Sequence, residues 1–255
     1  MTEDWDFYVC EVGGKWASMY LDLNIAGWAP DPKRTLLAFI RLNLQAPRPD
    51  GLSSRDESDR LVEIEDLLVP TVQQATGGVY VGRCTTGGAR DFYFYLDSRR
   101  GFDESVKEAA RSFPEYRYEI ISGEEPAWET YFNYLFPSPV DRQRILNRRV
   151  CDSLARQGDT MAEARPLAHW AYFDSPERRD AFLADVARLG FAHCGSVDPT
   201  PEQPRHGAQV IRDDVPSQKE IDAITLAILN AAIRHGGEYD GWETKVITPK
   251  DAESI

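Results

Sequence analysis

The stretch RPLAHWAYFDSPERRDAFLADVARLG, residues 165–190, decides the fold of the C-terminal half. Residues 165–173 contain the aromatic and apolar run His169-Trp170-Ala171-Tyr172-Phe173, which is typical of a strand. Ser175 can cap a following helix with Pro176 at its first position, and Gly190 can end that helix. The stretch therefore predicts a strand followed directly by a helix.

The residues on both sides of this stretch extend the pattern. They predict a helix over 140–157, strands over 191–197 and 208–213, a helix from Ser217 to Gly236, and a strand over 239–247. Glu220 stands three residues after Ser217, which is the spacing of a capping box. Residues 165–247 thus follow the order β-α-β-β-α-β of a ferredoxin-like sandwich, in which helices cover one face of an antiparallel sheet and can leave the other free.

The N-terminal half also mixes strands and helices. It predicts hairpins over residues 5–23 and 79–96, strands over 35–44 and 116–122, and helices over 54–72, 103–112 and 126–135. In the first helix, Ser54 and Glu57 have capping-box spacing, and Pro70 predicts a kink or break near Leu68. Pro137 and Pro139 mark a boundary. We therefore predict two α+β domains with mainly antiparallel sheets, residues 1–137 and 138–255, the second of them ferredoxin-like.

Composition and charge limit the classes of function. The formal charge is −13 in 255 residues, which opposes binding to phosphate backbones. Such a charge attracts a basic protein partner, but its more common role is to keep a protein soluble. No apolar run approaches the roughly 20 residues of a membrane span, and acids stand at the start where a signal peptide carries bases. We therefore expect a cytoplasmic protein that binds neither nucleic acid nor membrane.

The four cysteines and four histidines predict no metal site. Cys10, Cys84, Cys151 and Cys194 stand singly, without a CxxC pair, so we expect buried, reduced thiols. The histidines form neither HxH nor HExxH, and His169 on an apolar strand is typical of a hydrogen-bonded core residue. We predict no cofactor.

Specific residues of the C-terminal half then indicate a family. The run Gly236-Gly237-Glu238-Tyr239-Asp240-Gly241-Trp242-Glu243 follows a long helix, and the strand with His169, Tyr172 and Phe173 and the pair Gly190-Phe191 precede it. Residues 141–247 resemble the RraB family, the regulators of ribonuclease E activity. The resemblance implies a bacterial, ferredoxin-like domain that binds the endoribonuclease and lowers its activity without chemistry of its own.

The N-terminal half is similar to a separate family of uncharacterised bacterial domains that are sometimes fused to this inhibitor-like domain. Its matching segments are Ile64-Glu65-Asp66, Tyr80-Val81-Gly82-Arg83, Gly88-Ala89-Arg90-Asp91-Phe92-Tyr93-Phe94-Tyr95 and Trp128-Glu129-Thr130-Tyr131. That family implies no function. The fusion itself differs from the typical inhibitor, which is a single domain with an acidic extension.

The last predicted strand supplies the candidate partner-binding residues. Tyr239 and Trp242 flank Asp240-Gly241, and amphipathic aromatic residues beside a flexible turn are enriched at binding hot spots. We predict that Glu238, Tyr239, Asp240, Trp242 and Glu243 contact a protein partner, and the family resemblance implies ribonuclease E or a related nuclease as that partner. The alternative is that the two rings pack into their own sheet, which is the more common role of a Trp in a terminal strand.

No motif predicts catalysis. The chain has no GxSxG elbow and no cysteine in a known catalytic context. Arg83 and Arg90, beside Gly87-Gly88, could grip an anion, but we expect exposed charges at a hairpin tip. We predict a regulatory protein without catalytic residues. The alternatives are an enzyme with a site in the N-terminal domain or between the domains, and a protein that neutralises a toxin.

Overall fold

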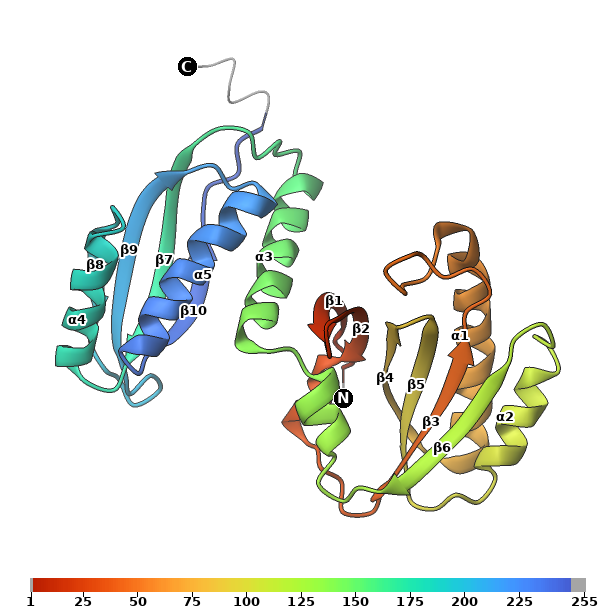
Figure 1. The fold of residues 1–255 in the computed structure, drawn as a ribbon. Coiled ribbons are helices and arrows are strands. Elements are labelled where there is room, and N and C mark those ends of the chain that lie inside the picture. Colours follow the sequence, from red (N-terminus) through yellow and green to blue (C-terminus); the bar gives the residue numbers. More distant parts are fainter. Residues whose placement is uncertain (1, 249–255) are drawn as a thin grey trace. The chain divides into compact units, whose positions relative to one another are not determined.

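Each half of the chain folds around its own antiparallel sheet (Figure 1). The computed structural model describes residues 2–248. It divides into two units, Met1–Asp141 and Arg142–Ile255. The N-terminal unit contains a six-stranded sheet and the C-terminal unit a four-stranded sheet. Both units combine helices with antiparallel strands, which confirms the predicted α+β class.

The N-terminal sheet has the strand order β1-β2-β4-β5-β3-β6, with all neighbours antiparallel. The two predicted hairpins are confirmed as β1–β2 and β4–β5. The elements are β1 (Trp5–Val12), β2 (Lys15–Asp22), η1 (Leu23–Gly27), β3 (Leu36–Asn43), α1 (Arg55–Thr76), β4 (Val79–Thr86), β5 (Ala89–Leu96), α2 (Phe102–Ala110), β6 (Tyr118–Glu124) and η2 (Thr130–Leu135).

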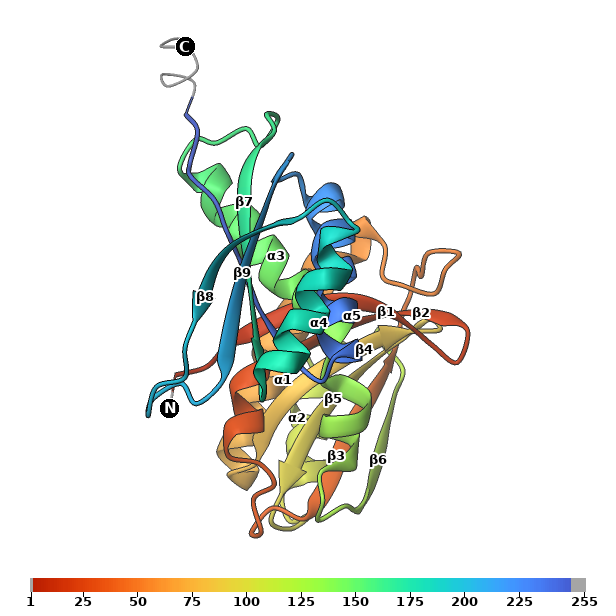
Figure 2. The ribbon, with the colours of Figure 1, turned by 90° about the vertical axis from the view of Figure 1, so that its left-hand side faces the viewer.

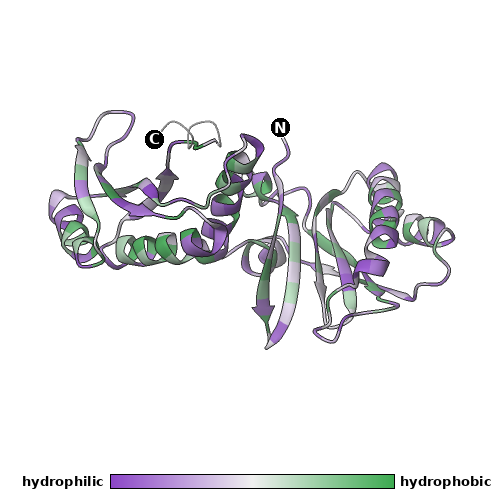
Figure 3. Cartoon of the chain, turned by 90° about the horizontal axis from the view of Figure 1, so that it is seen from above, coloured by the Kyte–Doolittle hydropathy of each residue, from purple (hydrophilic) through white to green (hydrophobic). Residues whose placement is uncertain are grey.

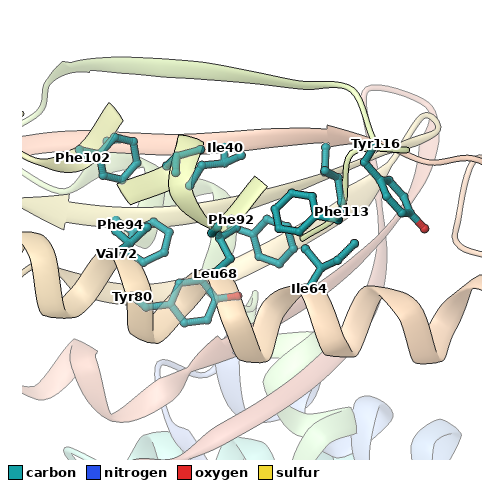
Figure 4. Packing of buried hydrophobic residues seen from close by; sticks show 14 of the residues in the cluster. Ile40, Ile64, Leu68, Val72, Tyr80, Phe92, Phe94, Phe102, Phe113 and Tyr116 are labelled. Carbon is teal, nitrogen blue, oxygen red and sulfur yellow. The ribbon is translucent and has the colours of Figure 1, made fainter. Parts of the chain in front are cut away.

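The helices α1 and α2 cover one face of this sheet. Phe92 and Phe94 of β5 pack against Leu68 and Val72 of α1, all completely buried (Figure 4). The helix α1 continues through Pro70 to Thr76, so the predicted break does not occur. Pro70 is exposed, and water can therefore satisfy the carbonyl group that loses its helical hydrogen bond at this position.

The opposite face of the N-terminal sheet is covered as well. The fully buried Trp128 ring stacks on Tyr95 of β5 at a centroid distance of 3.9 Å, and its Nε1 donates to the carbonyl of Arg34 at 2.7 Å. The predicted helix over residues 126–135 is instead the π-helix η2, Thr130–Leu135. Glu125 accepts from the backbone N–H of Thr130 at 2.6 Å and so satisfies its first turn.

The C-terminal unit has the predicted ferredoxin-like topology. Its strand order is β10-β7-β9-β8 with antiparallel neighbours, which is the arrangement of a β-α-β-β-α-β sandwich. Figure 2 shows β7, β9 and β8 of this sheet with the helix α4. Its elements, preceded by the helix α3 (Pro139–Arg156), are β7 (Arg165–Phe173), α4 (Pro176–Ala187), β8 (Ala192–Val197), β9 (His206–Asp214), α5 (Gln218–Arg234) and β10 (Glu238–Glu243).

The helices α4 and α5 bury their apolar sides against one face of this sheet. Phe182 and Val186 of α4 and Ile228 of α5 pack with Phe173 of β7 and Val210 of β9. The helices carry hydrophobic residues toward the core and hydrophilic residues on the outside (Figure 3). The core of the unit therefore lies between these helices and a single face of the sheet.

Candidate functional site

The side chains of β7 alternate between the two faces of the C-terminal sheet. His169, Ala171 and Phe173 are buried on the helix-covered face. Trp170 and Tyr172 alternate with them and are partly exposed on the other face. Two aromatic side chains of the kind found at binding hot spots thus lie on a sheet face that α4 and α5 do not cover.

The predicted partner-binding residues of β10 divide between these two faces. Tyr239 is 7 % exposed and Trp242 is 8 % exposed, so both rings pack into the unit. Glu238, Asp240 and Glu243 are exposed at the surface. The carboxylates of β10 are therefore accessible to a partner, whereas its two aromatic rings hold the strand in place within the unit.

A buried polar network holds Trp242 in place. Its indole Nε1 donates to Asn147 Oδ1 at 3.1 Å. Asn147 is fully buried on α3, and its Nδ2 donates to Asp222 Oδ1 at 2.8 Å and to Thr225 Oγ1 at 2.7 Å, both on α5. Gln143 completes the network by donating to Asn147 Oδ1 at 2.9 Å. One asparagine thus ties α3, α5 and β10 together.

A groove of about 570 Å³ crosses the edge strand β10. It is lined by Leu146 and Val150 of α3 on one side and by Trp170 of β7 on the other. Trp170 and the groove residue Trp242 lie on opposite faces of the sheet, because Trp242 is the register partner of His169. The groove can pass between the faces at Gly241, which follows the β-bulge after Tyr239 and carries no side chain.

Two titratable side chains mark the difference between the faces. On the covered face, burial and then the nearby Arg212 lower the pKa of His169 to about 3, so its imidazole is neutral. Its Nδ1 lies 2.8 Å from the Tyr239 hydroxyl. On the open face, partial burial and then the charge of Asp240 raise the pKa of Tyr172 above its ordinary value.

The sequence prediction did not include Trp170 and Tyr172 in the site. The signal was present in the alternation of His169-Trp170-Ala171-Tyr172-Phe173, which places alternate residues on opposite faces. The predicted core role of His169 is confirmed, since it is fully buried and hydrogen-bonded.

In the N-terminal unit, the prediction of exposed charges at the β4–β5 hairpin is wrong. Arg90 is 5 % exposed, and its Nε donates to Thr85 Oγ1 at 2.9 Å. Arg83 is half-buried and lies 2.5 Å from Glu65 on α1. Burial, followed by the charge of Arg83, lowers the pKa of Arg90 to about 10. Both arginines are packed beneath α1 because β4 and β5 direct them toward the helix layer.

The thiols and carboxylates give no indication of a metal site. Across residues 2–248, no three His, Cys, Asp or Glu side chains are grouped so that they could hold a metal ion. The cysteines are unpaired, and burial raises the pKa of Cys84 and Cys151 to about 11. Cys194 is exposed and Cys10 half-buried, so the expectation of buried thiols is wrong for these two. No helix within residues 2–248 is long and apolar enough to cross a membrane.

Comparisons with known proteins match both halves of the chain. A family model described as a family of unknown function, DUF695, matches residues 3–136, and the model of regulator of ribonuclease activity B, RraB, matches residues 144–244. These matches confirm the fusion that the sequence predicted. No curated protein sequence matches the chain.

Two solved structures are similar to the chain at low identity. One is an unknown protein from Galdieria sulphuraria, with 13 % identity, a TM-score of 0.23, and coverage of 83 % of this chain and 99 % of that chain. The other is described as a "putative glycine cleavage system transcriptional repressor", with 8 % identity, a TM-score of 0.23, and coverage of 82 % and 98 %.

Proposed function

Because the chain belongs to the DUF695 family and carries an RraB domain over residues 144–244, we propose that it is a regulatory protein that binds ribonuclease E or a related nuclease and lowers its activity. The RraB description names regulation of a ribonuclease. The observation that supports binding is the groove across β10, which joins aromatic side chains, apolar side chains and carboxylates at one open edge of the sheet.

The groove has the composition of a binding hot spot. Trp170 contributes a partly exposed indole, and Leu146 and Val150 contribute apolar side chains from α3. Burying such side chains beneath a partner removes apolar surface from water, and central aromatic residues usually carry most of the binding energy. Within residues 2–248, no strand pairs with the outer side of β10. A partner segment can therefore approach the groove from the sheet edge.

The charge of this edge favours a basic surface on the nuclease. Asp240 and Glu243 line the groove with one basic residue, Arg149, and Glu238 lies on the same strand, so carboxylates outnumber basic groups here. Opposite charge on the partner increases the rate of encounter, and salt weakens this contribution. Inhibition then follows by occlusion, because a domain seated on the nuclease blocks access of RNA. This activity requires no reacting group on the regulator, and we propose the cytoplasm as its location.

Calorimetric titration of the full chain against ribonuclease E, with an RNA-cleavage assay in parallel, tests the proposal. We expect binding in the micromolar range or tighter, and cleavage that falls as the complex forms. Trp170→Ala should weaken binding by about thirtyfold, equivalent to about 2 kcal/mol at a hot spot. Asp240→Asn with Glu243→Gln should weaken it several-fold and flatten its salt dependence.

Asp180→Asn is the matched control, because this exposed carboxylate lies on α4, on the other side of the sheet. It should bind as the unchanged chain does. No binding at tens of micromolar would exclude this nuclease as the target. Equal binding by all the variants would exclude the groove as the contact.

A further inference from the structure

A second groove lies on the N-terminal unit, between α1 and the β1–β2 hairpin. Two adjoining hollows of about 350 and 460 Å³ share Trp5, Val69 and Tyr80 in their walls. The first extends to Arg83 of β4, and the second extends to Trp28 beyond η1. Because they adjoin at these three side chains, an occupant of both hollows would extend across Trp5, Val69 and Tyr80, which suits an extended chain better than a compact ligand. The two adjoining hollows are called the groove below.

Contacts within the N-terminal unit fix the side chains that form the floor of this groove. The Tyr80 hydroxyl donates to Glu65 Oε1 at 2.9 Å, and Arg83 lies 2.5 Å from the other oxygen of Glu65. The Arg83 guanidinium lies over the Tyr20 ring at 4.6 Å. Trp5 stacks on Tyr20 at 5.1 Å and on Tyr80 at 5.4 Å. These contacts hold the aromatic walls in place, so a ligand meets a preformed surface.

The helix wall of the groove is apolar, and only Val69 within it also packs against the core. Val62 is 48 % exposed, and Val69 and Pro70 follow it on the same side of α1. The buried side of the helix is a different stripe, formed by Glu57, Leu61, Ile64, Leu68 and Val72. An exposed apolar wall next to the partly exposed ring of Trp5 is typical of an interaction site.

The charge around the groove is negative. Glu65 is neutralised by Arg83, which is the basic residue of the first hollow. Asp66 at one end and Glu3 at the other have no basic partner within residues 2–248, and Glu3 Oε2 accepts from Trp5 Nε1 at 3.0 Å. These carboxylates oppose a phosphate backbone. They also oppose a second copy of this chain, whose formal charge is −13.

We propose that this groove binds an extended, basic segment of another protein. An apolar side chain of the segment would lie against Trp5 and Val69, and its Lys or Arg side chains would face Asp66 and Glu3. The aromatic walls can also accept the aliphatic stems and charged ends of such side chains. The proposal rests on the N-terminal unit alone, so it stands or falls independently of the ribonuclease.

The test begins with a displayed library of random twelve-residue peptides selected on the full chain. Val62→Lys serves for counter-selection, since it replaces an exposed valine in the groove by a positive charge on a helix that tolerates lysine. We expect the surviving peptides to be basic, with interspersed apolar residues. A synthetic copy of the most enriched peptide is then titrated calorimetrically against the full chain.

Glu3→Gln with Asp66→Asn should weaken that peptide at least fivefold, and Glu104→Gln should leave its affinity unchanged. Glu104 is the matched control, because it is an exposed carboxylate on α2 of the same unit. Circular dichroism confirms that each variant is folded. The proposal is overturned if no peptide survives the counter-selection, if the survivors are acidic or uncharged, or if the double variant binds them as the unchanged chain does.

Discussion

The strands β5 and β7 both lie inside a sheet and both carry aromatic runs, but they are buried differently. In β5 the residues Phe92, Tyr93, Phe94 and Tyr95 are all buried, because α1 covers one face of the sheet and the segment around η2 covers the other. In β7, buried and partly exposed residues alternate. An aromatic strand is therefore accessible to a partner only where no second layer covers it.

The largest expected effect is a difference in stability between substitutions of Trp128, on a covered sheet face, and Trp170, on an open one. Trp128→Ala should lower the free energy of unfolding of the N-terminal unit by about 3–5 kcal/mol, because it removes a fully buried ring stacked on Tyr95. Trp170→Ala should cost less than about 1.5 kcal/mol, since its ring is already partly exposed. Urea denaturation followed by circular dichroism measures both. Equal losses would show that the face bearing Trp170 is covered after all.

The second prediction concerns the contribution of a buried ion pair to the stability of the C-terminal unit, whose sheet has one open face. Asp159 and Arg165 form an ion pair with side chains 1 % and 4 % exposed, and Asp159 Oδ2 also accepts from the backbone N–H of Ile247 at 2.9 Å. Asp159→Asn should lower the free energy of unfolding by about 3 kcal/mol, because it leaves a buried guanidinium without its counter-charge. Asp213→Asn, at an exposed position of β9, should change it by less than about 0.5 kcal/mol. A small loss at Asp159 would mean that water reaches the pair.

The third prediction uses pH to probe the covered face of β7. The imidazole of His169 has a pKa of about 3 in the fold and an ordinary value of 6.5, so the unfolded chain binds the extra proton first. The free energy of unfolding should therefore be highest above pH 6.5 and should fall by about 1.4 kcal/mol for each pH unit between 6 and 4.

Urea denaturation at several pH values measures this dependence. His169→Gln should remove most of it, because glutamine does not titrate and can still contact the Tyr239 hydroxyl. His193→Gln, at an exposed position of β8, should keep it. A His169→Gln chain with the original pH dependence would show that other groups cause it.

The sequence predicted the order of the helices and strands better than the hydrogen bonds at the helix ends. Ser175 caps α4 as expected, since its Oγ accepts from the backbone N–H of Arg178 at 3.4 Å. At Ser54 the helix begins at the predicted place, but the capping box does not form. Glu57 accepts instead from the backbone N–H groups of Gln45 and Ala46, at 2.7 and 3.0 Å. Local spacing cannot anticipate such a competitor, because the competing donors come from a different part of the fold.

The functional site was predicted only in part, again because contacts with a different part of the fold determine it. The sequence placed Asp240 and Trp242 on the last strand of a ferredoxin-like sheet, and this strand is the edge strand β10. It could not tell which side of that strand would be buried, because the bulge after Tyr239 shifts the register with β7. Trp242 therefore faces the core and bonds to Asn147, while the aromatic ring of the open face comes from Trp170 on the neighbouring strand.

The smallest expected effect concerns Glu238 and Asp240, two exposed carboxylates on β10. Glu238 already pairs with Arg205 at 2.5 Å, whereas no basic residue within residues 2–248 pairs with Asp240. Glu238→Gln should change the free energy of unfolding by less than about 0.5 kcal/mol, as is usual for a surface ion pair. It should also weaken nuclease binding less than Asp240→Asn does, since a partner must compete with Arg205 for the Glu238 carboxylate. Calorimetric titration of both variants in low and high salt decides the matter. A larger loss for Glu238→Gln would move the centre of the contact away from Asp240 and Tyr172, toward the start of β10.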